Sequence, residues 1–217
     1  MDARLAVRSD EARFAIYFAP HADSVLARFG SAWLGRDAAG RKPAARLAAE
    51  GFSAGRLAAL TAEPAHYGWH ATLKPPFRLA AGRTREALIS RLAAFAAART
   101  AFDIPALKLG SLGGFLALLP SATPEPLTRL ARDCVRAFDE FRAPASPDEL
   151  VRRLDGGLTP RQEALLARWG YPYVLEEFRF HLTLTARLEA AERRRLAAAL
   201  APLVAPLCRA PIPIDAV

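Results

Sequence analysis

One short pattern occurs twice in this sequence, and the repeat constrains the fold more than any other feature. An aromatic residue, a histidine, a spacer, a threonine and a leucine follow one another at Trp69-His70-Ala71-Thr72-Leu73 and again at Phe180-His181-Leu182-Thr183-Leu184. Both copies lie in short apolar segments, which are typical of β-strands. Side chains alternate between the two faces of a strand, so each histidine is expected to share a face with its threonine. The repeat therefore predicts two strands that each present one imidazole and one hydroxyl on the same side.

Composition indicates a globular protein with one sizeable core. The chain has 217 residues, of which 52% are hydrophobic and 24% charged, as in ordinary folded domains. No run approaches the roughly 18 apolar residues that a membrane helix needs, and Met1 to Asp10 lacks the segments of a signal peptide. We therefore expect a cytoplasmic protein without membrane association. Cys134 and Cys208 are expected to be buried thiols rather than a disulfide.

The positive charge raises the question of nucleic-acid binding. The formal net charge is +8, and basic surfaces attract phosphate backbones. Nearly all of this charge is arginine that is spread along the chain among Asp and Glu. The charge thus predicts no particular binding face, and RNA stays an alternative partner beside a small-molecule substrate.

The other segments predict irregularly alternating helices and strands. Strands are expected at about 13–18, 102–109, 115–119 and 212–214, with a Gly-rich hairpin joining the middle pair. Helices are expected to begin after the caps Asp23 or Ser24, Ser53, Thr84, Thr123, Ser146 and Thr159, with another over about 189–200. The second helix is expected to end before Pro64. Hairpins in this order predict the α+β class with antiparallel sheets, as a single domain over residues 1–217 with a helical insert at about 144–170.

Paired histidines and threonines suit proton transfer around a phosphate. One imidazole can act as a base while the other acts as an acid near neutral pH. Hydroxyls beside them can donate to the oxygens on which charge develops in the transition state. We therefore interpret His70, His181, Thr72 and Thr183 as catalytic residues for in-line attack on a phosphodiester.

Four further residues are candidates for substrate binding. Tyr17 points away from the apolar face of the first strand, and Tyr173 can stack on a base or sugar or pack within the fold. Lys74 follows Thr72 by two residues, and Arg179 precedes His181 by two. Each of these cations can bind a phosphate oxygen or lie solvated at a strand edge.

A metal site is not expected. His66 and His70 are four residues apart, but Gly68 between them and the predicted strand oppose a helical metal pair. His66 and His21 are interpreted as surface or loop residues. The sequence has neither a zinc-type cluster of Cys and His nor a His-Glu-x-x-His pattern. The prediction is a site without metal or cofactor.

These residues carry a resemblance to a known family. The paired motif resembles the 2H phosphoesterase superfamily, and longer blocks resemble its branch of phosphonate-metabolism proteins encoded beside carbon–phosphorus lyase genes. The blocks are 14–20, 67–77, 113–118, 158–165 and 178–185. The resemblance implies a bilobal α+β fold in which two antiparallel sheets line a central cleft, helices lie outside and the motif strands face each other.

The resemblance also implies an activity. It predicts a metal-independent cyclic phosphodiesterase, a hydrolase, or RNA 2′-5′ ligase-type chemistry. The expected substrate is a cyclic or diester ribose or nucleotide phosphate formed during phosphonate breakdown. Two alternatives remain: a non-catalytic module that binds nucleotides or RNA ends, and an accessory protein of a phosphonate-degrading system. The sequence predicts no oligomeric state.

Overall fold

The computed structural model describes residues 12–37, 43 and 45–217. Met1 to Asp10, where the sequence predicts no signal peptide, lies outside the described residues. The chain divides into two compact units, each built from three segments. Unit 1 comprises residues 1–16, 72–100 and 125–179, and unit 2 comprises residues 17–71, 101–124 and 180–217.

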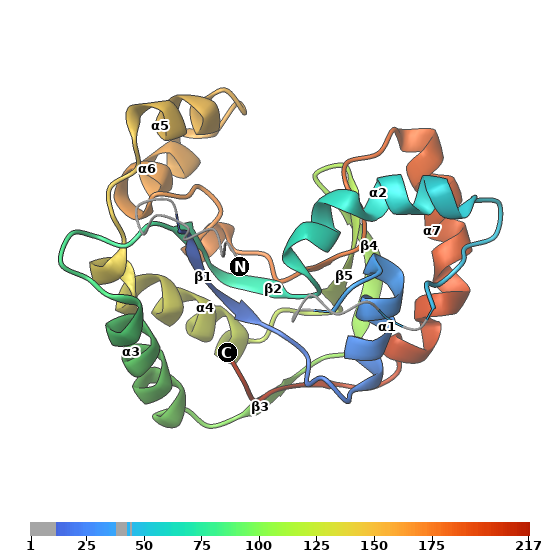
Figure 1. Cartoon of the computed structure of the whole chain (residues 1–217), viewed down its shortest axis with the longest axis horizontal. Coiled ribbons are helices and arrows are strands. Elements are labelled where there is room, and N and C mark those ends of the chain that lie inside the picture. The colour runs from blue at the N-terminus through green and yellow to red at the C-terminus, as the bar shows by residue number, and fades with distance from the viewer. Residues whose placement is uncertain (1–11, 38–42, 44) are drawn as a thin grey trace, which may run out of the picture. The chain divides into compact units, whose positions relative to one another are not determined.

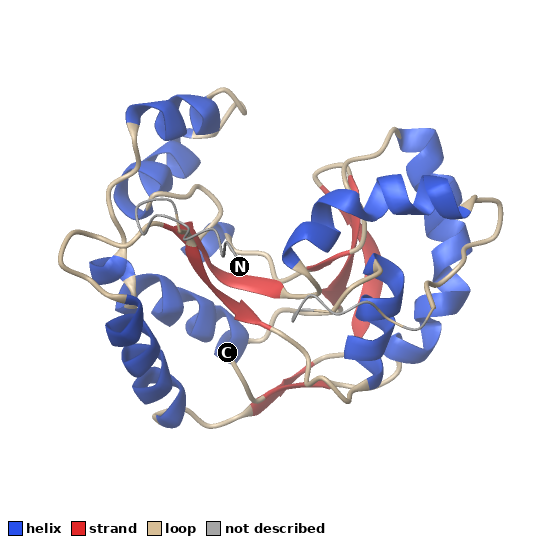
Figure 2. Ribbon diagram, in the orientation of Figure 1, coloured by secondary structure: helices blue, strands red, loops and turns tan. Residues whose placement is uncertain are grey.

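Helices and antiparallel strands are interspersed along the chain (Figures 1 and 2). The strands are β1 (Phe14–Phe18), β2 (Ala71–Phe77), β3 (Phe102–Ile104), β4 (Leu107–Leu112), β5 (Phe115–Pro120), β6 (Leu182–Thr183) and β7 (Ile212–Ile214). The α-helices are α1 (Val25–Leu34), α2 (Ala54–Tyr67), α3 (Arg85–Ala97), α4 (Glu125–Ala137), α5 (Pro147–Leu154), α6 (Pro160–Trp169) and α7 (Ala190–Val204). Short 3-10 helices are η1 (Asp139–Phe141), η2 (Leu175–Glu177) and η3 (Ala205–Cys208). The predicted α+β class is confirmed.

Unit 2 is built around the antiparallel sheet β4-β5-β6. The hairpin between β4 and β5 turns at Gly113 and Gly114, whose φ angles of 55° and 96° suit glycine in a tight turn. Helix α7 packs against β4 and β5, and α1 packs against α2 (Figure 1). The Trp33 indole of α1 donates to the Leu184 carbonyl at 2.8 Å, which ties this helix to the second His-Thr segment.

Unit 1 packs its helices around α4. Phe95 of α3 meets Phe138 edge to face, with ring centroids 5.1 Å apart. Val135 of α4 packs with Leu165 of α6 and with Val174. Both predicted capping boxes are present, at Ser146–Glu149 and Thr159–Gln162, so α5 and α6 begin where their sequence signals place them.

Two predicted boundaries differ from the structure because of prolines. Helix α2 continues through Pro64 to Tyr67, although proline deprives the Leu60 carbonyl of its usual helical donor. The Ala186 backbone N–H donates to that carbonyl at 2.8 Å instead. The strand expected over 102–109 is split by Pro105 into β3, which pairs with β7, and β4, which pairs with β5.

The second His-Thr strand is shorter than predicted. The ladder with β5 comprises Leu182 and Thr183. The next residue, Leu184, still donates its N–H to the Leu116 carbonyl at 2.9 Å, but the Leu116 N–H donates to the Thr185 hydroxyl at 3.0 Å. A side-chain oxygen thus replaces the backbone acceptor, and the regular ladder ends there. Thr185 is 1% exposed, so this hydrogen bond is buried.

Replacing Thr185 with valine is expected to lower the free energy of unfolding by about 1 to 3 kcal/mol, because the buried Leu116 N–H loses its acceptor. Urea denaturation followed by circular dichroism measures the loss. Thr183→Val on the same segment is the control, because Thr183 is only half-buried. If the two substitutions lower the free energy of unfolding equally, loss of the hydrogen bond from Leu116 to the Thr185 hydroxyl is not the cause.

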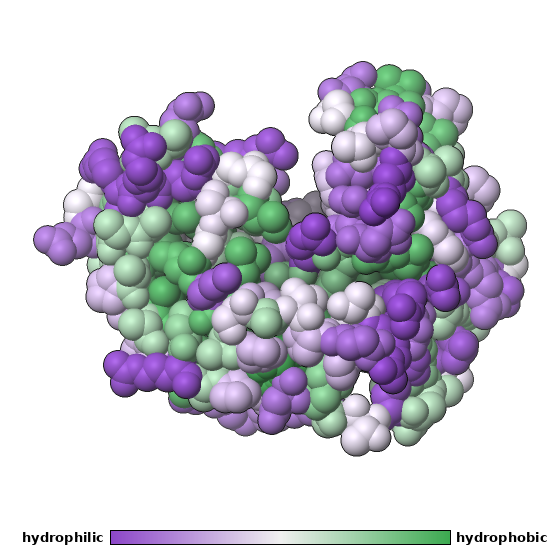
Figure 3. Space-filling model, turned by 180° about the vertical axis from the view of Figure 1, so that it is seen from behind, coloured by the Kyte–Doolittle hydropathy of each residue, from purple (hydrophilic) through white to green (hydrophobic). Residues whose placement is uncertain are grey.

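Hydrophilic residues do not gather into one patch on the face that Figure 3 shows. They lie in several groups with hydrophobic and intermediate residues between them. This agrees with the scattered arginines of the sequence and adds no support to a nucleic-acid face there.

Among the residues described, no helix has both the length and the apolar character needed to cross a membrane.

Candidate functional site

The first histidine is held at the junction between α2 and β2. Gly68 ends α2 with a φ of 79°, Trp69 is 3% exposed, and His70 is the last residue before β2. Its Nδ1 lies 3.0 Å from the Gly68 carbonyl oxygen. A carbonyl can only accept, so Nδ1 carries the proton, and Nε2 of the neutral ring is left as an acceptor.

Tyr17 covers one face of this imidazole. Its ring stacks on His70 with a centroid separation of 3.7 Å and an interplanar angle of 25°. Tyr17 belongs to β1, which pairs with β2, so the sheet brings the two residues together. Burial, with a smaller contribution from Tyr67, raises the pKa of the Tyr17 phenol, and the hydroxyl therefore keeps its proton at neutral pH.

The second histidine is placed in the same way. His181 is the last residue before β6, and its ring lies beside Phe115 of β5 with centroids 5.6 Å apart. Each motif therefore positions its imidazole one residue ahead of a strand and beside an aromatic ring of the neighbouring strand. Both predicted strands begin one residue later than the histidines.

The two imidazoles of unit 2 interact electrostatically. Burial lowers the pKa of His70, the hydrogen bond to Gly68 opposes this, and the charge of His181 lowers the pKa further. His70 is therefore neutral at pH 7. A neutral acceptor next to a second imidazole can bind a ligand that offers both a hydroxyl proton and acceptor oxygens.

The threonines of the two motifs are both half-buried. Thr183 lies in β6 opposite Ala117 of β5, in the same unit as both histidines. Thr72 is the second residue of β2 and belongs to unit 1. The role of both hydroxyls in binding phosphate stays a prediction.

Lys74 lies inside unit 1. Its side chain is 2% exposed, and its ammonium donates to the Val135 carbonyl at 3.0 Å. The nearest carboxylate oxygen is that of Asp139, at 3.7 Å. Burial lowers the lysine pKa to about 8, against the opposing effect of Asp139. The predicted phosphate contact stays a prediction, but these partners already give Lys74 a structural role.

Tyr173 and Arg179 also lie in unit 1. The Tyr173 ring meets Tyr171 edge to face at 5.7 Å and is 49% exposed. The Arg179 guanidinium donates to the Phe178 carbonyl at 2.9 Å and to the Glu176 carbonyl at 3.3 Å. Substrate binding by these two residues remains a prediction as well.

Metal-ligating side chains do not converge in the part of the chain that the structure covers. No group of three or more His, Cys, Asp or Glu residues there is arranged to hold an ion. Both cysteines are free thiols, but only Cys134 is buried as predicted, and Cys208 is half-buried.

Sequence reasoning did not identify two parts of this site. The Gly68 carbonyl, which fixes the His70 tautomer, is a backbone group and leaves no side-chain signal. Phe115 follows the Gly113-Gly114 turn, and its place beside His181 depends on the pairing of β5 with β6. Only the register of these strands reveals that contact.

Comparison with known proteins identifies the family. Residues 72–217 match the family described as "Protein of unknown function (DUF1045)". The chain belongs to this family. No solved structure matches it.

Two curated relatives cover most of the chain. A protein of Janthinobacterium sp. (strain Marseille) named "Ribose 1,5-bisphosphate phosphokinase PhnN" is 44% identical over 176 residues, which are 81% of this chain and 39% of the relative. A protein of Laribacter hongkongensis (strain HLHK9) with the same name is 41% identical over 177 residues, which are 82% of this chain and 40% of the relative. The chain thus spans about two fifths of the length of these relatives.

These names correct the predicted activity. A phosphokinase is a transferase, so the prediction of a cyclic phosphodiesterase, and with it the hydrolase class, is wrong. The predicted association with phosphonate metabolism is supported by the name PhnN. The reason for the error is chemical: paired imidazoles and hydroxyls suit any phosphate ester, and the side chains alone do not specify which reaction follows binding.

Proposed function

We propose that this chain binds a phosphorylated ribose through the His70 and His181 site of unit 2, in a ribose phosphate pathway associated with phosphonate use. The observation that carries the proposal is the neutral His70, whose Nδ1 faces the Gly68 carbonyl and whose Nε2 is an acceptor. The names of the two relatives support ribose 1,5-bisphosphate as the ligand.

Such a ligand matches the groups that the site contains. Ribose hydroxyls can donate to Nε2 of His70, while phosphate oxygens can accept from a ring N–H of His181 and from the Thr183 hydroxyl. The stacked Tyr17 and the tilted Phe115 restrict the orientation of both imidazoles. A site that is oriented before binding loses less entropy when the ligand arrives.

Phosphoryl transfer is not part of the proposal. The relatives' activity belongs to whole proteins of which this chain matches about two fifths. Kinases of the P-loop type cradle phosphates with a glycine-rich loop that ends in Gly-Lys. The lysines of this chain, Lys42, Lys74 and Lys108, follow Arg41, Leu73 and Leu107, so none forms that pair. We therefore propose the ligand-binding part of the reaction alone.

The finer family and fold assignments belong to the same proposal. We propose that the chain descends from the 2H phosphoesterase superfamily and shares its arrangement of two sheets lining a cleft. The equivalent placement of His70 and His181, each one residue before a strand, supports this descent. Binding of phosphate esters would then be the inherited property.

Isothermal titration calorimetry of the purified chain with ribose 1,5-bisphosphate tests the proposed function. His70→Gln is expected to weaken binding about tenfold or more, because a buried hydrogen bond to the ligand is disturbed. His21→Gln is the matched control, since the His21 side chain is 77% exposed. Ribose 5-phosphate and a short RNA test the other ligand classes.

Three outcomes would contradict the proposal. Wild-type protein without affinity for ribose 1,5-bisphosphate would overturn it, as would equal affinity in His70→Gln. Release of ADP from ATP and ribose 1,5-bisphosphate by this chain alone would show that it performs phosphoryl transfer itself. Thermal denaturation of each variant establishes that the compared proteins are folded.

A further inference from the structure

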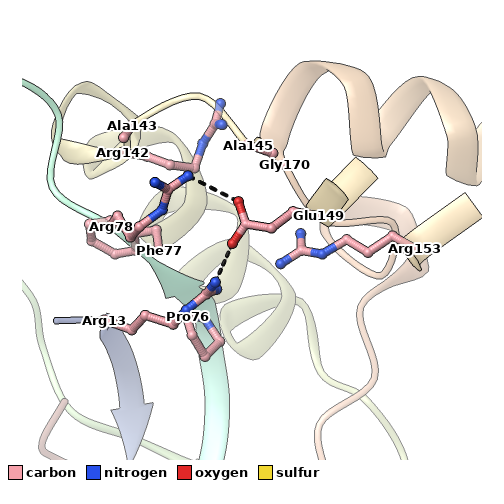
Figure 4. A pocket seen from close by; sticks show the side chains of 10 residues that line it. All are labelled: Arg13, Pro76, Phe77, Arg78, Arg142, Ala143, Ala145, Glu149, Arg153 and Gly170. Carbon is pink, nitrogen blue, oxygen red and sulfur yellow. Dashed lines mark hydrogen bonds and ion pairs between the residues drawn. The ribbon is translucent and has the colours of Figure 1, made fainter. Parts of the chain in front are cut away.

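A pocket in unit 1, whose lining includes no residue of either histidine motif, is lined by four arginines and one glutamate among other residues (Figure 4). Its charged residues are Arg13, Arg78, Arg142, Arg153 and Glu149. Arg13 directly precedes β1, Arg78 directly follows β2, Arg142 follows η1, and Glu149 and Arg153 belong to α5. The pocket opens to solvent, and its cavity volume is about 20 Å³. A ligand larger than water therefore has to bind at its mouth.

Glu149 lies at the centre of the pocket as a fixed carboxylate. Its two oxygens face Arg13 and Arg78 (Figure 4), and one of them accepts from the Ser146 N–H at 2.9 Å. The Ser146 hydrogen bond and the neighbouring arginines lower the Glu149 pKa to about 2. The carboxylate is therefore ionised across the physiological range and contributes one full negative charge.

The arginines of the pocket outnumber its single carboxylate. Arg142 pairs with Asp139, at 2.7 Å, and donates to the Arg168 carbonyl. Arg153 is half-buried and forms no ion pair with any carboxylate in the described part of the chain. Its guanidinium lies 5.3 Å from the centre of the Tyr171 ring, and Figure 4 shows it directed toward Glu149 and Arg13.

A half-buried guanidinium without a carboxylate partner is costly, because burial removes water that it would otherwise bind. Burial is the main cause of a lowered Arg153 pKa; Tyr171 and Glu149 oppose it, and Arg13 and Arg142 add smaller contributions in the same direction as burial. An anion with several acceptor oxygens would satisfy the unused donors of Arg153 and Arg13 together. Guanidinium groups bind phosphate by paired hydrogen bonds more specifically than lysine does.

We propose that the mouth of this pocket, between Arg153 and Arg13, is a binding site for a phosphate group. The group can come from inorganic phosphate or from a phosphorylated sugar, because the guanidinium donors contact only the phosphate oxygens. The site shares no residue with the His70 site and does not depend on the function proposed for that site.

Titration of the whole chain with inorganic phosphate tests this site, with sodium chloride at matched ionic strength as the reference because exposed charge pairs are screened by salt. Wild-type protein is expected to bind phosphate. Arg153→Met keeps most of the side-chain volume but removes the donors, and it is expected to weaken binding about tenfold or more. Arg153→Lys, which keeps the charge but loses the planar fork, is expected to give an intermediate affinity.

Arg152→Met is the matched control. Arg152 is the neighbouring residue of α5, carries the same charge and is exposed, with its guanidinium donating to the Asp148 carbonyl. Its replacement is expected to leave phosphate affinity within a few-fold of wild type. Parallel titrations with ribose 5-phosphate and with ribose distinguish the source of the phosphate. Binding of ribose 5-phosphate without binding of inorganic phosphate indicates a sugar phosphate as the ligand. Binding of both compounds indicates that the site recognises the phosphate group alone.

Two results would overturn the proposal. The first is wild-type protein that binds neither phosphate, and the second is unchanged affinity in Arg153→Met. The His70→Gln variant distinguishes the two sites. If it no longer binds ribose 1,5-bisphosphate but still binds inorganic phosphate, the His70 site and the Arg153 site are independent. If inorganic phosphate binding depends on His70 and not on Arg153, the arginines serve only to hold β1, β2 and α5 together.

Discussion

Replacing Gly30 with alanine is expected to lower the free energy of unfolding by about 3 kcal/mol, at the upper end of the usual cost of overpacking a core. Gly30 lies in α1, and a Cβ added there would be 2.1 Å from Cγ of Trp69 and 2.3 Å from Cδ1. Real contacts of that kind do not approach closer than about 3 Å, so the indole has to move. Trp69 is 3% exposed, and the dense surroundings leave it little room.

Gly55→Ala is the control for this substitution. Gly55 is also helical, in α2, and a Cβ there would have no atom within 4 Å. Alanine costs less conformational entropy than glycine in a helix, so Gly55→Ala is expected to raise the free energy of unfolding by up to about 1 kcal/mol. Urea denaturation of both variants measures the contrast. A Gly30→Ala protein as stable as wild type would show that the Trp69 ring can relocate freely.

The same substitution connects packing to the site. Trp69 directly precedes His70, and the His70 imidazole is oriented by the carbonyl of Gly68, the residue before Trp69. A displaced Trp69 therefore changes the position of the imidazole. At temperatures where Gly30→Ala remains folded, its affinity for ribose 1,5-bisphosphate is expected to fall together with that of His70→Gln, whereas Gly55→Ala keeps wild-type affinity.

Local signals in the sequence predicted many of the elements. The caps Ser24, Ser53 and Thr84 and the two capping boxes each satisfy N–H groups within their own first turn, so distant residues do not alter them. The Gly113-Gly114 turn is equally local. Helix starts and tight turns could therefore be read from a few adjacent residues.

Features that depend on distant partners were not predictable. Helix α2 passes through Pro64 because Ala186 supplies a donor from far along the chain, and β6 ends early because Thr185 replaces a backbone acceptor. For the site, the motif identified both histidines, but the Tyr17 stack and the Phe115 contact require strand pairing. Function was missed for a related reason: side chains that recognise phosphate are shared by enzymes with different reactions.

Lys74 is expected to make the stability of the protein depend on pH between about 8 and 10.5. Burial lowers its pKa in the folded state to about 8 from the ordinary value of 10.5, which the unfolded chain retains. Between these values the unfolded state binds more protons than the folded state, so the free energy of unfolding rises with pH. Below pH 8 the folded protein carries the full cost of the buried ammonium.

Comparison with Lys74→Met isolates this effect. Relative to the variant, wild-type protein is expected to gain about 1 kcal/mol between pH 8 and 9 and about 3 kcal/mol by pH 10.5. In the variant the Val135 carbonyl, in the last turn of α4, loses the ammonium that donates to it. That loss lowers the free energy of unfolding by the same amount at every pH, so it does not change the pH dependence. Asp139 keeps Arg142 and Arg168 as partners.

Urea denaturation at pH 7, 8, 9 and 10 measures both curves, and Lys108→Met is the control, because Lys108 is exposed on β4. Burial raises the Cys134 pKa to about 12, which makes the folded state lose stability with rising pH above about 9. Cys134 is present in every variant, so subtracting the Lys74→Met curve from the wild-type curve leaves the contribution of the lysine. The subtraction is cleanest between pH 8 and 9, below the range in which Cys134 contributes. Wild-type and Lys74→Met curves that run parallel would show that the ammonium is not desolvated in the folded protein. A lower affinity of Lys74→Met for ribose 1,5-bisphosphate would then favour the predicted contact between Lys74 and phosphate.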